Sequence, residues 1–280
     1  MDLKFATVVE LKQGPGLAGI FQMIELAGRT CYKSEDRITP DSASAFVNEL
    51  IRNGHGAMLE HGTVYLKLKW WQIGKIIKYF FAPYTESNSL LYVTTNYRVI
   101  VENKWEEDLK LLCKPTEKHA KRRTFRIQCD IGVSREANRH RVNSIAEQST
   151  RCCNYSKGKF NNEISVIMPD ECSDQELIPG GTYRVLRDFM GYKVSKDPEK
   201  QPNALHYWFA ANAVCEYCYM NLLRLGWKPQ QARRILPLDT VTELVHTAFE
   251  SDWKHFLDLR CAANAHPDMI KVANIIKYLL

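Results

Sequence analysis

The chain of 280 residues is 45% hydrophobic and 25% charged, a composition that excludes a disordered or fibrous protein and can supply a sizeable core. Its apolar runs are short, and the opening MDLKFATVVELKQG holds no run of signal-peptide length, so we expect no membrane span, no leader and a cytoplasmic location. The net charge of +6 is modest for this length, which favours a small anionic ligand over an extended nucleic-acid surface.

Alternation and helical spacing predict the elements of the first half. In chain order they are a strand over FATVVEL, a helix near 16–28, a helix over 42–53 capped by Asp41, and a strand over 63–68. Residues 70–123 look like an elaboration with a second β-rich run, a short helix and the basic link KHAKRR.

The second half interleaves strands and helices without a regular βαβ rhythm. In chain order we first predict a strand over 124–131, a helix over VSREANRHRV capped by Ser134, and a strand over 164–169. An exposed loop over 170–202 with one short helix follows, and then a helix over 203–225 and a helix from KPQQARRIL to Pro237. The chain ends with a strand, a helix over 251–260 and a closing helix from Pro267. The class is therefore α+β, with a mixed, mainly antiparallel sheet and flanking helices. We expect a single catalytic domain over 1–280 with the elaboration at about 70–123.

Nine cysteines, an odd number in a long chain, predict free thiols rather than a disulfide framework. Cys215 and Cys218 form one CxxC pattern, but a zinc site needs two more ligands and the sequence has no second CxxC. We interpret this pair as two cysteines on a buried helix and predict no metal site. His206 and His246 lie in apolar stretches and are interpreted as core or interface histidines.

The densest chemistry lies at 135–157, REANRHRVNSIAEQSTRCCNYSK. On a helix, the side chains of Arg139, His140 and Arg141 would point in directions spread over about 200°, which is poor for binding one ligand together. At a helix end that enters a loop, the three neighbouring residues could surround a diphosphate. Guanidinium groups present a planar fork of donors to phosphate oxygens. The loop SIAEQSTR adds hydroxyl and backbone donors, and the Glu147 carboxylate can accept hydrogen bonds from ribose or a base N–H.

The residues alone leave two other interpretations of this segment open. Charge clusters are usually solvated helix faces, although the following CCNYSK carries little charge. REANRHR could also be a recognition helix for DNA or RNA, which would bind with strong salt dependence.

The spacing of these residues resembles the flavin-dependent thymidylate synthases. RHR at 139–141, followed after seven residues by Ser149, matches the RHRx7S signature of that family. NGHGAMLEHGTVYL is similar to its histidine-containing loop and strand, with His55 and His61 at the matching places. QARRILPLDTVTEL resembles the segment with Arg233 before Leu-Pro, and WKHFLDLRCAANAHPDMIKVA resembles the closing helices with Arg260 after leucine.

This resemblance implies reductive methylation of dUMP to dTMP. Methylenetetrahydrofolate is then the one-carbon donor, and reducing equivalents pass from NADPH through FAD. It also implies a homotetramer with active sites shared between subunits, and neither nucleic acid nor membrane as a partner. A flavoprotein acting on another nucleotide is the alternative.

The same resemblance assigns roles to individual residues. Those expected to bind FAD are His55, Arg139, His140, Arg141, Glu147 and His255. Those expected to bind dUMP are Glu136, Arg139, Glu147, Gln148, Ser149, Thr150, Arg151, Arg233 and Arg260. Arg260 is the expected catalytic residue, because a fixed cation beside uracil N3 stabilises the ionised, electron-rich ring without a cysteine nucleophile. Cys152 and Cys153 are then packing or spacing residues.

Two departures from the family pattern limit these assignments. Phe249-Glu250-Ser251 stands where many members carry Asn-x-Arg facing the flavin, so that contact does not carry over. His255 matches a later asparagine and can still donate a hydrogen bond. Cys152 occupies the position of a frequent tyrosine, with Tyr155 three residues on.

Overall fold

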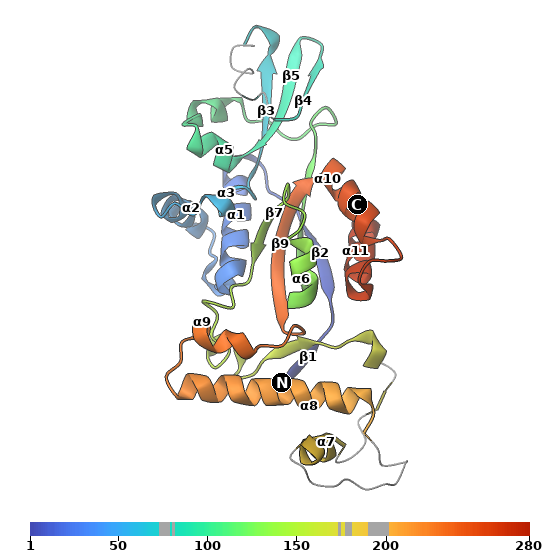
Figure 1. Cartoon of the computed structure of the whole chain (residues 1–280). Helices are drawn as coiled ribbons and strands as arrows, with labels where there is room; N and C mark the ends of the chain where they lie inside the picture. The colour runs from blue at the N-terminus through green and yellow to red at the C-terminus, as the bar shows by residue number, and fades with distance from the viewer. Residues whose placement is uncertain (73–78, 80–81, 173–174, 177–180, 190–201) are drawn as a thin grey trace. The chain divides into compact units, whose positions relative to one another are not determined.

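A computed structural model of the chain describes residues 1–72, 79, 82–172, 175–176, 181–189 and 202–280 (Figure 1). The chain divides into two compact units, each built from separate segments. The large unit comprises Thr7–Ile127, Arg135–Gln148 and Glu243–Leu280, and the small unit comprises Met1–Ala6, Gln128–Ser134 and Ser149–Thr242. None of the helices within the described ranges has the length and apolar character needed to cross a membrane.

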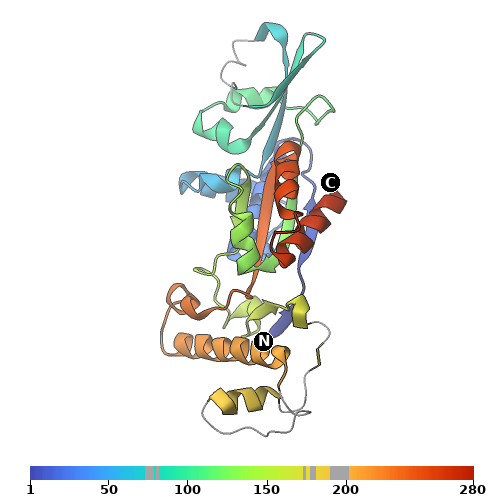
Figure 2. The ribbon, with the colours of Figure 1, turned by 45° about the vertical axis from the view of Figure 1, so that its right-hand side comes forward.

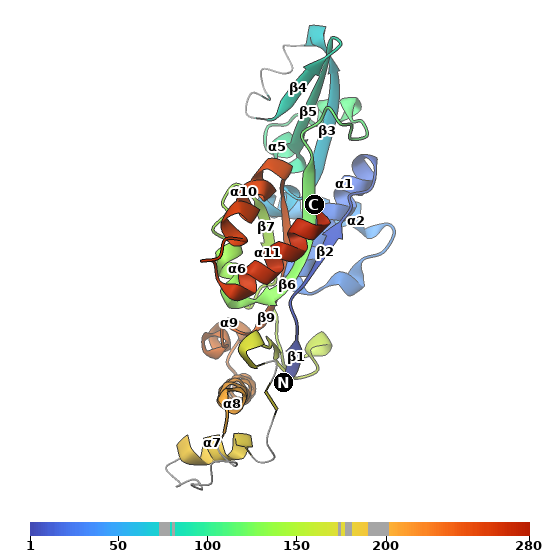
Figure 3. The same cartoon turned by 90° about the vertical axis from the view of Figure 1, so that its right-hand side faces the viewer.

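A four-stranded sheet in the order β2-β6-β9-β7 organises the large unit. Its strands are β2 (Thr7–Leu11), β6 (Arg122–Asp130), β7 (Ser144–Glu147) and β9 (Val241–Phe249). Helix α1 (Gly16–Tyr32) lies on one side of the sheet, and α10 (Glu250–Arg260) and α11 (Pro267–Leu279) lie on the other (Figures 1 and 3).

Strand alternation explains how the two faces of this sheet are filled. Strands β7 and β9 are antiparallel, and Ala146 stands opposite Val245. These two side chains pack against Ala27 of α1. The next residue of β9, His246, faces the other way and its ring contacts Trp253 of α10 at 4.4 Å between centroids. Figure 2 shows α10 and α11 beside β9.

A second, three-stranded antiparallel sheet in the order β3-β5-β4 also belongs to the large unit. Its strands and the helices near them are β3 (Thr63–Lys69), β4 (Tyr84–Ser87), β5 (Leu90–Asn96), α2 (Ser42–Arg52), α3 (Gly56–Leu59) and α5 (Tyr97–Glu102). Val47, Val64, Val93 and Ile100 form one fully buried core with the side of α1 that carries Ile24. The elaboration expected at 70–123 contains β4, β5 and α5; that it is an addition to a catalytic domain stays a prediction.

The small unit combines a two-stranded parallel sheet with helices. Its elements are β1 (Asp2–Lys4), β8 (Ser165–Ile167), α7 (Gly181–Phe189), α8 (Ala204–Arg224) and α9 (Pro229–Ala232). Its core contains Tyr155, Ile164, Val166 and Tyr219. Within the described residues of both units, the 3₁₀ segments are Glu35–Arg37, Trp70–Gln72, Glu106–Leu111, Gly158–Phe160, Asp170–Cys172 and Arg233–Ile235.

The α+β class with antiparallel sheets is confirmed, and so are most predicted helices and strands. The cysteine pair on α8 was misjudged in burial, because Cys215 is half-buried and Cys218 is exposed. All nine cysteines are free, as predicted. Of the loop predicted over 170–202, residues 173–174, 177–180 and 190–201 lie outside the described residues, and α7 is its one short helix.

Two local predictions around the arginine-rich segment were wrong. Helix α6 spans Ile131–Ala137, earlier than predicted, and Asp130 rather than Ser134 caps it: Oδ1 of Asp130 accepts the Val133 N–H at 2.7 Å. Ser134 lies inside the helix and its hydroxyl donates to the Ile131 carbonyl. The beginning of the predicted polar loop is strand β7, because Ser144 and Ala146 are small, buried residues that pair with β9.

Candidate active site

Arg139, His140 and Arg141 lie just after α6, in consecutive turns. Arg139 N–H donates to the Glu136 carbonyl at 3.2 Å, and His140 N–H donates to the Ala137 carbonyl at 3.1 Å. Arg139 and Arg141 are exposed, whereas His140 is only 8% exposed. Because these residues are not helical, they do not form the recognition helix considered for nucleic acid.

The two exposed arginines of this turn carry unbalanced charge. Within the described ranges, neither the Arg139 nor the Arg141 guanidinium has a hydrogen-bonded or ion-paired partner. A guanidinium in water needs no protein partner, but two of them two residues apart, without a carboxylate, offer donors to an anion with several oxygens. The turn therefore fits a phosphate-bearing ligand.

Arg260, the last residue of α10, meets the arginine-rich segment from 124 residues away in sequence. Its Nη1 donates to Glu136 Oε2 at 2.6 Å, its Nη2 donates to the Glu136 carbonyl at 2.8 Å, and its Nε donates to His140 Nε2 at 3.0 Å. The Arg260 side chain is 18% exposed. These three bonds fix the plane of the guanidinium and leave two of its five N–H donors for another acceptor.

His140 is held neutral, which lets it accept the Arg260 hydrogen bond. Burial lowers its pKa to about 4, and the nearby positive charges of Arg260 and His255 act in the same direction. Its ring lies 4.6 Å from the Phe256 ring and 6.2 Å from the His255 ring, centroid to centroid. Since Nε2 accepts from Arg260, the proton of the neutral ring lies on Nδ1.

Two fully buried histidines lie in the same unit, and sequence reasoning gave neither a polar partner. His246 Nε2 bonds to Asn143 Nδ2 at 2.8 Å, and His61 Nδ1 bonds to Thr247 Oγ1 at 2.8 Å. Burial lowers the pKa of both histidines to about 3. Their other ring nitrogens, His246 Nδ1 and His61 Nε2, are buried without partners. The prediction of His246 as a core residue is confirmed, although its hydrogen bonding is incomplete.

The remaining predicted residues of the large unit take different positions. Glu147 ends β7 and accepts a hydrogen bond from Asn138 Nδ2 at 3.0 Å. Gln148 is buried, and its N–H donates to the Glu243 carbonyl at 2.8 Å. His55 is exposed at the start of α3, a helix that contacts β7. His255 is exposed on α10.

In the small unit, the turn that starts at Ser149 holds the other predicted residues. Ser149 Oγ accepts from the Cys152 N–H at 3.3 Å. Arg233 Nη1 donates to Thr150 Oγ1 at 3.3 Å, and Arg151 Nε donates to Gln230 Oε1 at 3.3 Å, a partner that sequence reasoning missed. Both arginines are exposed, and among the described residues their guanidinium groups bond only to neutral side chains through long bonds, so both charges are available to an anion.

The chain is similar to proteins of one known family. The profile of the family described as "Thymidylate synthase complementing protein" matches residues 118–280, more than half of the chain. The flavin-dependent thymidylate synthase of Corynebacterium aurimucosum is 23% identical over 267 residues, covering 90% of this chain and 72% of that protein. That of Corynebacterium glutamicum is 23% identical over 202 residues, covering 70% and 72%.

Solved structures give weaker similarity. A UMP/dUMP methylase PolB from Streptomyces cacaoi, bound with 5-Br UMP, is 18% identical with a TM-score of 0.46, covering 100% of this chain and 90% of that one. The same methylase bound with 5-Br dUMP is 20% identical with a TM-score of 0.42, covering 99% and 89%.

Proposed function

Because this chain belongs to the thymidylate synthase complementing protein family, the family of the flavin-dependent thymidylate synthases, we propose that it methylates dUMP reductively to dTMP. Methylenetetrahydrofolate donates the one-carbon unit, and NADPH reduces the FAD. The observation that carries the proposal is the convergence of Arg260 on Glu136 and His140, since it joins the closing helices to the RHR segment with a fixed cation.

Arg139 and Arg141 fit the diphosphate of FAD. Both are exposed in one turn, and within the described residues neither guanidinium has a hydrogen-bonded or ion-paired partner, so their donors can meet phosphate oxygens. His55, Glu147 and His255 would supply further contacts to the cofactor. When bound, FAD supplies the reducing equivalents of the reaction. His140 is assigned to the same site, and its Nε2 accepts the hydrogen bond from Arg260 Nε.

Arg151 and Arg233 would bind the phosphate of dUMP. Each is exposed, and in the part of the chain that the structure describes its guanidinium bonds only to a neutral amide or hydroxyl, which supports a charge left for the phosphate. Thr150 and Ser149 add hydroxyl donors beside these charges. Glu147, Gln148 and Arg139 are assigned to the sugar and base of the same nucleotide.

Arg260 would activate the uracil ring. The methylation needs an electron-rich ring carbon, and ionisation at N3 supplies it only if the negative charge is stabilised. Two N–H donors of Arg260 remain for N3 and the neighbouring carbonyl oxygen after its three bonds within the protein. Glu136 and neutral His140 position the guanidinium, and no cysteine nucleophile is needed.

We also propose a homotetramer whose active sites are shared between subunits. Helix α8 supports an association surface, because Tyr207 and Tyr217 are 51% and 70% exposed and Leu225 just after it is 79% exposed. No nucleic acid or membrane partner is proposed. A cytoplasmic location stays a prediction, with which nine free cysteines agree.

A pair of arginine variants tests the binding assignments. A hydrogen bond to a charged group contributes about 1.5–3 kcal/mol. Arg151→Ala should therefore raise the dUMP dissociation constant by roughly one to two orders of magnitude at unchanged FAD content. Arg141→Ala should lower the FAD occupancy of the purified protein. The flavin absorbance of the purified variants measures the FAD occupancy, and its change on titration with dUMP measures the dUMP dissociation constant.

Arg224→Ala is the matched control, because Arg224 is an exposed arginine at the end of α8 whose guanidinium, like those of Arg151 and Arg233, donates to a neutral side chain, Asn221, at 3.4 Å. It should leave both measurements unchanged. If Arg151→Ala and Arg141→Ala behave like this control, the arginines are a solvated surface and the proposed function loses its support. A colourless wild-type protein that takes up no added FAD would have the same consequence.

A second test concerns Cys152 and Cys153. Their backbone N–H groups donate to Ser149, and Cys153 is buried while Cys152 is exposed, which supports packing and turn formation rather than attack. Cys152→Ala with Cys153→Ala should keep measurable dTMP formation. Complete loss of activity in a folded, flavin-loaded double variant would show that a thiol takes part in the chemistry.

A further inference from the structure

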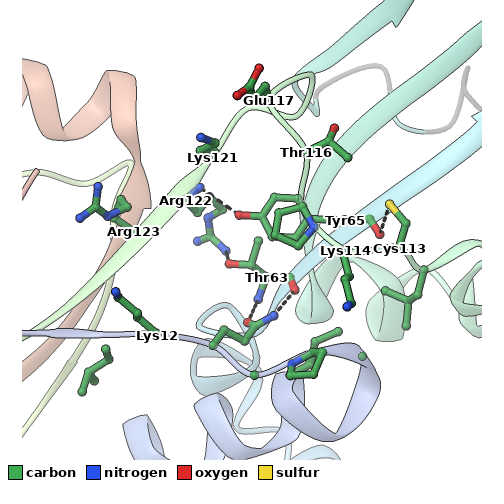
Figure 4. Close-up of a pocket in the computed structure, with 18 of the residues that line it drawn as sticks. Lys12, Thr63, Tyr65, Cys113, Lys114, Thr116, Glu117, Lys121, Arg122 and Arg123 are labelled. Carbon is green, nitrogen blue, oxygen red and sulfur yellow. Dashed lines mark hydrogen bonds between the residues drawn. The ribbon is translucent and has the colours of Figure 1, made fainter.

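The large unit contains a cavity of about 780 Å³ that none of the residues assigned to FAD or dUMP lines. Its wall comes from the chain between the end of β2 and the start of α1, the beginning of β3, and the chain that leads into β6 (Figure 4). A volume of this size is typical of sites for small molecules, which run from about 300 to 1,000 Å³.

Positive charge dominates this cavity. Arg123 is paired with Glu10 at 2.5 Å, so these two charges compensate each other. Lys12, Lys114 and Lys121 also line the wall, and their ammonium groups have no hydrogen bond or ion pair within the ranges that the structure describes. Their only remaining acidic neighbour in the described lining is Glu117. The cavity is therefore built to favour an anion.

Arg122 adds a half-buried cation whose hydrogen-bonded partners are neutral. Its Nη1 donates to the Glu60 carbonyl at 2.9 Å and its Nη2 to Ser144 Oγ at 3.2 Å, so its protein partners are neutral. Its Nε is buried and has no partner. Burial lowers the pKa of Arg122 to about 10. The carboxylates of Glu60 and Asp252 act on this guanidinium only through space, so an anion in the cavity would add stabilisation to the Arg122 charge.

The N-terminus of α1 opens on the same cavity. Gly14, Pro15 and Gly16 line the wall, and the first turn of α1 has neither an acidic residue nor a side-chain cap. The first N–H groups of a helix lack intrahelical partners and carry partial positive charge, which suits phosphate oxygens. A side chain at Gly19 would lie 1.9 Å from the Gly14 carbonyl, so this loop can pack closely on the helix only with glycine there.

The non-polar part of the wall can accept a ring. Tyr65, Ile20, Leu112 and Pro115 line it. The Tyr65 ring is held edge-on to His119 at 5.2 Å, and its hydroxyl accepts the Arg122 N–H at 3.3 Å. A fixed aromatic ring next to a cationic wall matches a ligand that has a planar base and a phosphate chain.

We propose that this cavity binds a nucleoside di- or triphosphate. The phosphate chain contacts Lys12, Lys114, Lys121, Arg122 and the first turn of α1, and the base packs against Tyr65. This site goes beyond the proposed methylation and is independent of it, because it uses none of the residues assigned to FAD or dUMP.

Calorimetry on the full chain tests this site with FAD and dUMP present at saturation, so that their sites are filled. The probes are ATP, inorganic tripolyphosphate and adenosine. ATP should bind more tightly than tripolyphosphate, and adenosine should bind weakly. Lys12→Ala with Lys114→Ala should raise the ATP dissociation constant roughly 10- to 100-fold. Both lysines are on the surface of the cavity, so the double variant is expected to fold.

Lys118→Ala is the control, because Lys118 is an exposed lysine of the same loop that does not line the cavity. It should bind ATP like the wild type. Absence of ATP binding, or equal binding by the double variant, overturns the proposal. Tripolyphosphate binding as tightly as ATP overturns the nucleotide assignment, because the wall at Tyr65 would then contribute nothing. None of these results depends on methylation activity, so the two proposals fail separately.

Discussion

Replacement of Arg260 with alanine is expected to slow dTMP formation by roughly 10²–10³-fold, because loss of one preorganised electrostatic donor costs about 3–4 kcal/mol of barrier. The variant should still fold and hold FAD, since the Arg260 side chain is partly exposed and lies at the end of α10. Single-turnover formation of dTMP at saturating dUMP measures the loss. Arg260→Lys keeps the charge but cannot reproduce the three fixed bonds, so it should recover only part of the rate.

Arg135→Ala is the control for this experiment. Arg135 is exposed on α6 beside Glu136 and is assigned no role. It should turn over like the wild type. Near-normal turnover of Arg260→Ala would remove the assigned role in uracil activation. Loss of FAD from Arg260→Ala would assign the residue to cofactor binding instead.

Acidification from pH 7 to pH 5 is expected to lower the free energy of unfolding by about 4 kcal/mol through His61 and His246 together. Both have a pKa of about 3 in the folded chain against 6.5 in the unfolded one. Below pH 6.5 the unfolded chain therefore binds protons that the folded chain does not. The stability that their burial in neutral form provides is present above pH 6.5 and is lost as the pH falls towards 3.

Urea unfolding at pH 7, 6 and 5 measures this dependence, provided that the transition is two-state. His61→Gln and His246→Gln should each make the unfolding free energy less dependent on pH, since glutamine keeps hydrogen-bonding capacity but does not titrate. His55→Gln is the control, because His55 is exposed and should leave the dependence unchanged. A wild-type protein whose unfolding free energy stays constant between pH 7 and 5 would contradict the burial of neutral histidines.

Local patterns predicted most elements because the physical cause lies within a few residues. Helix α1 follows from apolar spacing, α2 from the Asp41 cap and the stop at Asn53-Gly54, and Pro267 does begin α11 as expected. Strand β7 was missed because it has four residues with polar ends, too short for a visible alternation. What makes it a strand is its pairing with β9, about a hundred residues later in the chain.

The sequence indicated the residue types of the candidate site, but it did not predict which of these residues contact one another. The spacing of RHR and Ser149 indicated the family without any coordinates, because it depends only on residue types and their order. It could not reveal that Arg141 is exposed while His140 is buried, since that depends on where the turn after α6 packs.

The sequence by itself determined the family, the cationic character of the site and the secondary structure with local causes. Only the tertiary structure decided which groups meet. Arg260 reaches Glu136 and His140 because α10 packs on the sheet beside α6, and the pKa of His140 falls because that packing removes water. Such contacts join residues far apart in the chain, and they exist only once burial of the apolar faces has offset the entropy of closing the loops between them.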